Sequence, residues 1–245
     1  PSPMALRPWS PIPIHECGEP LVSLPHCLWR LEPHPYRLLG APYGPNGDPF
    51  RLREGVVDRL LQAEETLQAD SPGMRLAVFD AWRPLGVQRF MVRHALVQEC
   101  DQQGVNPDRP SGQRDRIEAE VGRFWAPPSE DPATPPPHST GAAVDLTLAD
   151  GAGLPCPMGG AIDAIGAVSE PEFYRAAAER DPDGEASRWH RHRQLLAQVM
   201  ASAGFAQHPN EWWHFSWGDQ LWAWRSGTAA ARYGRVEEEE SSRNS

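Results

Sequence analysis

The segment Glu211-Trp212-Trp213-His214-Phe215-Ser216-Trp217 organises this chain, together with His138-Ser139-Thr140-Gly141-Ala142-Ala143-Val144-Asp145. Between them the two segments offer two histidines, one aspartate and one glutamate. A mononuclear zinc centre that hydrolyses a substrate needs three protein ligands, one open position for water, and a separate carboxylate that takes the proton of that water. The sequence therefore predicts that His138, Asp145 and His214 bind one Zn²⁺ per chain and that Glu211 is the general base.

These side chains converge only if the backbone bends. Residues an odd number apart point to opposite faces of a straight strand, so Glu211 and His214 require a bend, which Pro209-Asn210 provides. The histidine and the aspartate of the other segment are seven residues apart and converge if the strand breaks at Ser139-Thr140-Gly141. A single histidine beside tryptophans is usually packed in a core, but two segments with complementary ligands favour a metal site. The other histidines are expected to be structural or at the surface: His15, His26, His34, His94, His190, His192 and His208.

Composition excludes several functional classes. The net charge is −10, so the chain lacks the basic character with which proteins neutralise nucleic-acid phosphates. All 23 basic residues are arginine, which excludes a phosphate-loop lysine, a Schiff-base lysine and a Ser-x-x-Lys pair. No run of about 18 apolar residues is present, so no transmembrane helix is predicted. Neither nucleic acid nor a membrane is therefore an expected partner, and the sequence gives no signal for oligomeric state.

Three segments are expected along the 245 residues. Residues 1–35 are proline-rich and predicted to form an extended arm, 36–236 a single folded domain, and 237–245 an acidic, disordered tail. The N-terminus lacks a charged region followed by an apolar run, so no signal peptide is predicted. The four cysteines have neither Cys-x-x-Cys nor metal-finger spacing, which indicates free thiols. These features predict a cytoplasmic protein.

Periodicity and turn residues predict an α+β domain. Helices are expected at 54–69, from Pro84 to about 96, at 115–124 and at 187–203, with strands at 74–79, at 142–148 and within 205–217. The long polar stretch 101–137 is expected to form a wall or lid of the site. The result is a small, mainly antiparallel sheet with helices packed around it and covering one side. Arg83 follows the first of these strands and is either a cleft residue, a surface arginine or the partner of Asp80 in an ion pair.

With these residues in view, the chain resembles the VanX-type D-alanyl-D-alanine dipeptidases. They belong to a zinc peptidase group that also contains D,D-carboxypeptidases and the hedgehog signalling domain, so the resemblance implies that fold. The resemblance lies in five short segments: Pro35-Tyr36, Asp80-Ala81-Trp82-Arg83-Pro84, the segment from His138 to Leu148, Met158-Gly159-Gly160-Ala161-Ile162-Asp163, and Glu211-Trp212-Trp213-His214.

The resemblance assigns roles that the residues alone do not. It implies the same zinc ligands and general base, and it implies that Arg83 steadies the scissile carbonyl as it becomes an oxyanion. Asp163 receives the free ammonium group of a small dipeptide substrate, and Tyr36 lines that end. The family commonly has a substrate-holding serine two residues before the first histidine, where this chain has Pro136.

The leading hypothesis is a zinc-dependent enzyme that hydrolyses D-Ala-D-Ala in cell-wall precursor turnover. A D,D-carboxypeptidase or peptidoglycan endopeptidase with the same chemistry is an alternative. Asp163 disfavours it, because a carboxylate at this position favours substrates with a free N-terminus. A zinc-stabilised binding module without catalysis is a further alternative, disfavoured because binding alone requires neither Glu211 nor Arg83.

Overall fold

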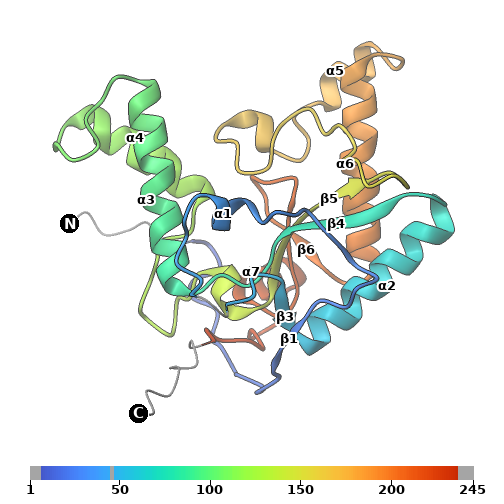
Figure 1. Cartoon of the computed structure of the whole chain (residues 1–245), viewed down its shortest axis with the longest axis horizontal. Helices are drawn as coiled ribbons and strands as arrows, with labels where there is room; N and C mark the ends of the chain where they lie inside the picture. Colours follow the sequence, from blue (N-terminus) through green and yellow to red (C-terminus); the bar gives the residue numbers. More distant parts are fainter. Residues whose placement is uncertain (1–6, 45–46, 237–245) are drawn as a thin grey trace.

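The computed structural model of the chain describes residues 7–44 and 47–236 and is built around a five-stranded sheet (Figure 1). The strand order is β2-β4-β5-β7-β6, and a separate two-stranded sheet pairs β1 with β3. Within the described residues the β2–β4 contact is parallel and the other contacts of the large sheet are antiparallel, as predicted. The strands are β1 (Leu21–Ser23), β2 (Trp29–Arg30), β3 (Arg51–Arg53), β4 (Arg75–Asp80), β5 (Ala143–Ala149), β6 (Ala206–Gln207) and β7 (His214–Ser216).

The four long helices occupy the positions that periodicity predicts, and three short ones add to them within the described residues. The helices are α1 (Pro35–Leu38), α2 (Glu54–Asp70), α3 (Leu85–Gln102), α4 (Gly112–Phe124), α5 (Arg175–Arg180), α6 (Glu185–Ser202) and α7 (Gln220–Ser226). The side chains of Ser111 and Asp219 cap α4 and α7, where they accept backbone N–H groups of the first turn that have no partner within the helix. A 3₁₀ turn, η1 (Pro137–Thr140), precedes β5.

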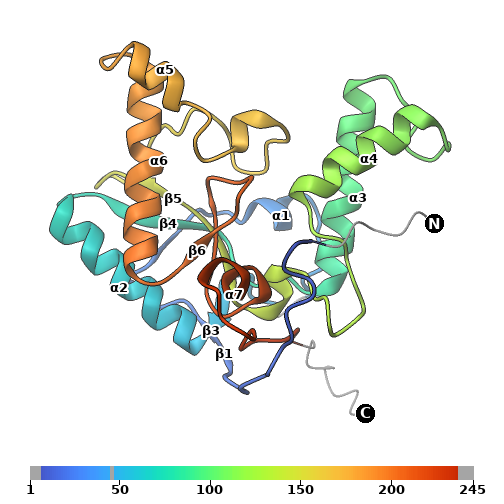
Figure 2. The same cartoon turned by 180° about the vertical axis from the view of Figure 1, so that it is seen from behind.

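The large sheet separates two hydrophobic cores. The helices are therefore packed around the sheet, as predicted, but they cover both of its sides and not one side only. Successive side chains of β4 alternate between the two faces. Leu76 and Val78 are fully buried in the main core, under α2 and α6. Phe79 points the other way and packs against the second core, which α3 and α4 form with Tyr36 and Tyr43. Figures 1 and 2 show the two groups of helices on opposite sides of the sheet.

The N-terminal segment contributes more than the extended arm that its prolines predict. Its residues 21–23 and 29–30 form β1 and β2, and Leu24 and Leu28 are buried in the main core. Arg53 fastens this region, because its guanidinium donates to the carbonyl of Thr140 (2.8 Å), to that of Gly234 (3.0 Å), and to the Glu16 carboxylate. Packing therefore shows no boundary at residue 35. The predicted acidic tail, 237–245, lies outside the described residues, as does the start of the arm, 1–6.

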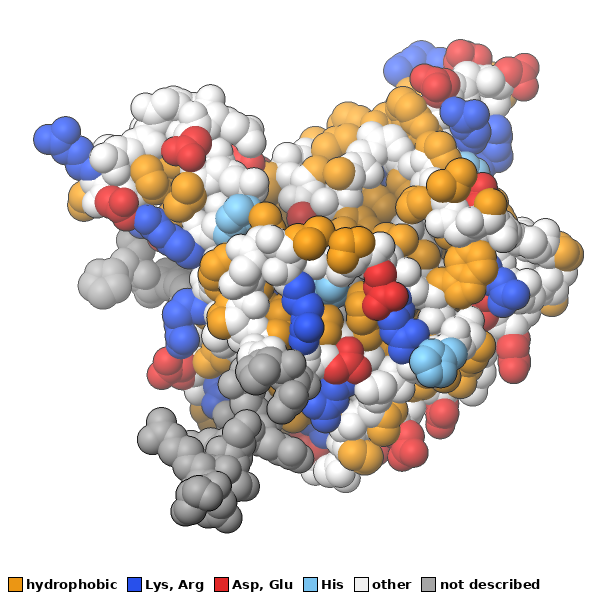
Figure 3. All heavy atoms as spheres, in the orientation of Figure 1, with side chains coloured by type: hydrophobic (Ala, Val, Ile, Leu, Met, Phe, Trp, Pro, Cys, Tyr) orange, Lys and Arg blue, Asp and Glu red, His pale blue; other side chains and the backbone are white. Residues whose placement is uncertain are grey.

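The surface in the view of Figure 3 is indented between the part formed by α3 and α4 and the part formed by α5 and α6. Charged side chains are dispersed around this indentation and do not form a patch of one sign. All four cysteines are free thiols. No helix in the described part of the chain has the length and apolar character needed to cross a membrane.

Candidate active site

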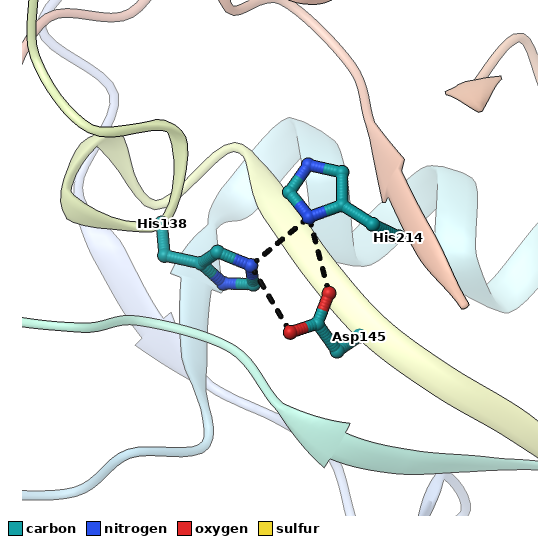
Figure 4. A group of neighbouring side chains, drawn as sticks. All are labelled: His138, Asp145 and His214. Atoms are coloured by element: carbon teal, nitrogen blue, oxygen red, sulfur yellow. Dashed lines mark hydrogen bonds and ion pairs between the residues drawn. The ribbon is translucent and has the colours of Figure 1, made fainter. Parts of the chain in front are cut away.

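The side chains of His138, Asp145 and His214 point toward one another in the buried centre of the molecule (Figure 4). Nε2 of His138 lies 3.2 Å from Oδ2 of Asp145, and Nδ1 of His214 lies 3.1 Å from Oδ1 of the same carboxylate. The two imidazole nitrogens are 3.2 Å apart. All three ligand atoms lie within 4.8 Å of one another, so one metal ion can reach all of them.

Sheet pairing and a glycine turn bring the three residues together. Asp145 on β5 and His214 on β7 are directly opposite partners in the antiparallel ladder, which places their side chains on the same face. His138 is turned toward them by η1, which ends at Gly141 with φ +73°. A Cβ at this position would stand 2.3 Å from Cδ2 of Leu21, so both the conformation and the space require glycine. The break expected at 139–141 is therefore present.

Hydrogen bonding fixes which nitrogen of His138 is free. Its Nδ1 donates to the carbonyl oxygen of Ala81 at 2.7 Å, so Nε2 carries the lone pair that faces the centre. Burial by itself raises the pKa of the Asp145 carboxyl, but the two imidazoles outweigh burial and hold that pKa well below 3.8. Asp145 is therefore a carboxylate at any physiological pH.

Glu211 lies beside the three candidate metal ligands but is not one of them. Its Oε2 is 3.6 Å from Nδ1 of His214, and its buried Oε1 has no hydrogen-bond partner among the described residues. The chain turns at Pro209-Asn210, as predicted, and β7 begins only at His214. Burial, followed by the negative charges of Asp145 and Asp163, raises the pKa of Glu211 well above 4.5. The carboxyl therefore has a high affinity for a proton.

Arg83 is both an ion-pair partner and a cleft residue. Its Nε and Nη2 lie 3.0 and 2.8 Å from Oδ2 of Asp80, and Nη2 also lies 3.4 Å from Oδ2 of Asp145. Its guanidinium carbon lies 5.1 Å from the ring centres of Tyr36 and Trp125. Because the side chain is buried and lines the pocket, the surface-arginine alternative is excluded.

Asp163 and Tyr36 meet at another part of the pocket. The Tyr36 hydroxyl donates a 2.6 Å hydrogen bond to Oδ2 of Asp163. Burial, and then the charge of Asp145, raises the pKa of Asp163 to about 7. Asp163 also has φ +67°, in the left-handed region that costs a non-glycine residue energy and is tolerated best by aspartate and asparagine.

The three candidate ligands, Glu211, Arg83 and Asp163 line one pocket of about 240 Å³. Tyr36 does not line it and is connected to it through the hydrogen bond to Asp163. One wall is the end of α4 with the residues that follow it, a second is the proline run 135–137, and a third carries Glu211, Trp213 and His208. The stretch 101–137 thus provides a wall, as predicted. The volume lies below the roughly 300–1,000 Å³ typical of sites for drug-sized ligands, which indicates a small substrate.

Of the histidines expected to be structural or at the surface, His208 lines the pocket, whereas His34 is structural as expected and supports a residue of the site. His208 is buried, lines the pocket, and has Nδ1 3.8 Å from Oε1 of Glu211. Burial, and then the charge of His214, lowers the pKa of His208 well below 6.5, so it is neutral. His34 is buried with Nε2 2.9 Å from Asp80, where it supports the carboxylate that holds Arg83. The position of His208, three residues before Glu211, is a sequence signal that could have indicated its place.

Two imidazoles and one carboxylate within reach of one ion, with a second carboxyl beside them in a pocket, are an arrangement typical of metal-dependent hydrolases. Comparison with known proteins narrows this class. The model of peptidase family M15, described as D-ala-D-ala dipeptidase, matches residues 30–233. The chain belongs to this family and is a peptidase.

Individual relatives have the same description. The D-alanyl-D-alanine dipeptidase of Synechocystis sp. (strain PCC 6803) is 44% identical over 245 residues, covering 95% of this chain and 98% of that protein. The D-alanyl-D-alanine dipeptidase of Escherichia coli (strain K12) is 29% identical over 148 residues, covering 60% and 57%. Among solved structures, VanYB in complex with D-Alanine-D-Alanine has 18% identity and a TM-score of 0.41, over 75% of this chain and 81% of that one.

Proposed function

We propose that this chain hydrolyses the dipeptide D-Ala-D-Ala with one zinc ion held by His138, Asp145 and His214. The observation that carries the proposal is the presence of these three side chains and Glu211 in a single buried pocket of small volume. Membership of the dipeptidase family and the name of the Synechocystis relative support the substrate.

The donor set fits zinc. Two neutral imidazoles and one carboxylate are usual ligands of catalytic zinc sites, which keep a position open for water or substrate. Oδ1 of Asp145 is buried and lacks a good hydrogen-bond partner, as expected for an atom that faces a cation. Zinc, when bound, supplies the Lewis acidity that makes water nucleophilic near neutral pH and polarises a carbonyl.

Glu211 transfers the proton in the proposed reaction, and Arg83 stabilises the negative charge that develops on the carbonyl oxygen. Glu211 is close to the three ligands and its pKa is raised, so it accepts the proton of the attacking water and delivers it to the leaving nitrogen. Arg83 donates to the carbonyl oxygen as negative charge develops on it. Because Asp80 already fixes the guanidinium, this donor is preorganised and is worth about 3 kcal/mol in the transition state.

Asp163 explains a preference for a free N-terminus. Its carboxyl, held by the Tyr36 hydroxyl, faces the pocket and pairs with the ammonium group of a dipeptide. An N-acylated substrate has no charge to offer there and leaves the carboxyl unpaired. The same arrangement disfavours a carboxypeptidase or endopeptidase, whose substrates are blocked at this end.

Release of D-alanine from D-Ala-D-Ala by the zinc-loaded chain tests the proposal, together with metal analysis. A panel of D-Ala-D-Ala, L-Ala-D-Ala and N-acetyl-D-Ala-D-Ala separates the alternatives. Turnover of the free dipeptide alone supports a dipeptidase, and faster turnover of the N-acetylated compound indicates a carboxypeptidase. Stoichiometric zinc without turnover above that of Glu211→Gln indicates a binding module and contradicts the proposal.

A further inference from the structure

The N-terminal segment 7–12 is part of the pocket, although it precedes the residues that the family model matches. Trp9 is buried, and its ring packs edge-on against the His208 ring at 5.5 Å. Gln220, at the start of α7, holds the segment by hydrogen bonds to its backbone. Its amide nitrogen donates to the carbonyl oxygens of Ser10 (3.2 Å) and Ile12 (2.6 Å). These contacts hold the segment in a defined position, where it forms one wall of the pocket.

Arg7 brings a positive charge to this wall. Its guanidinium donates to the carbonyl oxygens of Gly122, Arg123 (3.3 Å) and Trp125 (3.5 Å), at the end of α4. A guanidinium has five N–H donors, so three bonds leave two donors free. Within residues 7–44 and 47–236, no carboxylate lies within ion-pair distance of Arg7. The free donors are the N–H of Nε and one N–H of Nη1, which lie on different edges of the guanidinium, so each can make a single charge-assisted hydrogen bond to a carboxylate.

The described lining of the pocket contains one other arginine. Arg83 is the other arginine among the described lining residues, and Asp80 already neutralises it. The neighbouring wall is Pro135-Pro136-Pro137, and proline has neither a backbone N–H nor a polar side chain.

The pocket also contains a charged group of each sign, as a dipeptide zwitterion requires. The charges acting on Glu211 include both Asp163 and Arg7. Those acting on Asp163 come from Asp145, Arg83 and Asp80, and the one acting on Arg7 comes from Glu211. Glu211 is therefore within electrostatic reach of both the Asp163 carboxyl and the Arg7 guanidinium, and all three line the same pocket.

We propose that Arg7 binds the C-terminal carboxylate of the substrate and that segment 7–12 closes the pocket behind it. This inference rests on the proposed function, since it assumes that a dipeptide occupies the pocket with its ammonium group at Asp163. It makes the N-terminal segment a determinant of substrate length. A substrate extended at its C-terminus would have no free carboxylate at this position and would meet the wall.

A comparison of D-Ala-D-Ala with its C-terminal amide tests the role of Arg7. Arg7→Met should lower kcat/KM for the free acid about 10- to 100-fold, mainly through KM, because one charge-assisted contact is lost. It should change kcat/KM for the amide by no more than about twofold. Arg7→Lys keeps the charge and should restore part of the preference for the acid. Arg123→Met is the matched control, because that exposed arginine pairs with Glu120 and does not line the pocket.

Parallel losses on acid and amide in both Arg7 variants would show that Arg7 only holds the wall in place, and would overturn the inference. An unchanged acid-to-amide ratio in Arg7→Met would overturn it as well. Failure of the proposed function has a different signature, because the unmodified chain would then release no D-alanine. Calorimetric binding of acid and amide to zinc-loaded Glu211→Gln protein, with and without Arg7→Met, measures the same preference without turnover.

Discussion

The Tyr36 hydroxyl and the Asp163 carboxylate, 127 residues apart in the sequence, form a 2.6 Å hydrogen bond at the edge of the pocket. This bond fixes one carboxylate oxygen and leaves the other free to accept from a ligand. The left-handed backbone at Asp163, φ +67°, is held in place although it costs energy. Such strain is common where a side chain must be aimed at a substrate.

Replacing Asp163 should weaken recognition of the free N-terminus. Asp163→Asn keeps the shape but removes the charge, so KM for D-Ala-D-Ala should rise about 10- to 100-fold. The rate on N-acetyl-D-Ala-D-Ala should change little, which reduces the discrimination between the two substrates. Tyr36→Phe keeps the carboxylate and should have a smaller effect in the same direction. Steady-state kinetics on both substrates check this, and unaltered discrimination in Asp163→Asn would contradict the assignment.

The raised pKa of Asp163 makes a prediction about stability. Because this pKa is about 7 in the folded chain and 3.8 ordinarily, the folded state holds a proton that the unfolded state releases. The stability contributed by this carboxyl is therefore present at low pH and falls as the pH rises from about 4 to about 7. Asp163→Asn does not titrate, so its gain in Tm over the unmodified chain should be larger at pH 8 than at pH 5. Thermal unfolding of the metal-free proteins measures it, and equal differences at the two pH values would refute it.

Glu211→Gln should separate chemistry from binding. Loss of a general base lowers kcat by about 10²- to 10⁴-fold, while KM and zinc content should stay close to their original values. The same change should raise the stability of the metal-free protein at neutral pH, because burial makes a charged carboxyl costly at this position. Kinetics, metal analysis and thermal unfolding give three readouts. A variant that loses zinc together with activity would mean that Glu211 is a ligand.

Sequence alone located the residues that share the centre, because each segment contains its own signal. A proline or glycine break stands next to each candidate ligand, and the structure places bends at Pro209-Asn210 and Gly141. The sequence could not show that Asp145 and His214 are opposite partners in a ladder, because strand pairing depends on the whole sheet. For Arg83 the sequence leaves three alternatives, a cleft residue, a surface arginine or an ion-pair partner of Asp80, and the buried geometry combines the first and the third.

Other parts escaped prediction for a physical reason. His208 lies three residues before Glu211, but that spacing alone could not show that its ring packs against Trp9 from the opposite end of the chain. The proline-rich N-terminus has no period, so its docking through Gln220 is invisible until α7 is placed. The short helix α7 itself was missed although Asp219 is a good cap, because seven residues are too few for a periodic pattern.

Removal of zinc should destabilise the chain as well as inactivate it. A ligand that binds only the folded state adds about 4 kcal/mol when its concentration is 1,000 times Kd. For a chain of this size that corresponds to roughly 8–16 °C in Tm. Chelation should therefore lower Tm and abolish D-alanine release, and added zinc should restore both. His214→Ala should show no such shift, and an equal shift in that variant would place the metal elsewhere.

The loop that carries Asp163 depends on a buried arginine of α6. Arg193 donates to the carbonyl oxygens of Met158 (2.8 Å), Val168 (2.9 Å) and Glu170 (2.9 Å), which lie on either side of Asp163. A lysine cannot reproduce this planar fork, so Arg193→Lys should cost about 2–4 kcal/mol of stability.

Because Asp163 is then held less firmly, KM for D-Ala-D-Ala should rise more than KM for the N-acetylated dipeptide, while kcat falls less. Arg191→Lys, on the exposed side of the same helix, is the matched control and should leave both parameters unchanged. Chemical denaturation and kinetics on the two substrates give the result. Destabilisation of Arg193→Lys with equal changes on both substrates would mean that Arg193 supports the fold but does not position Asp163.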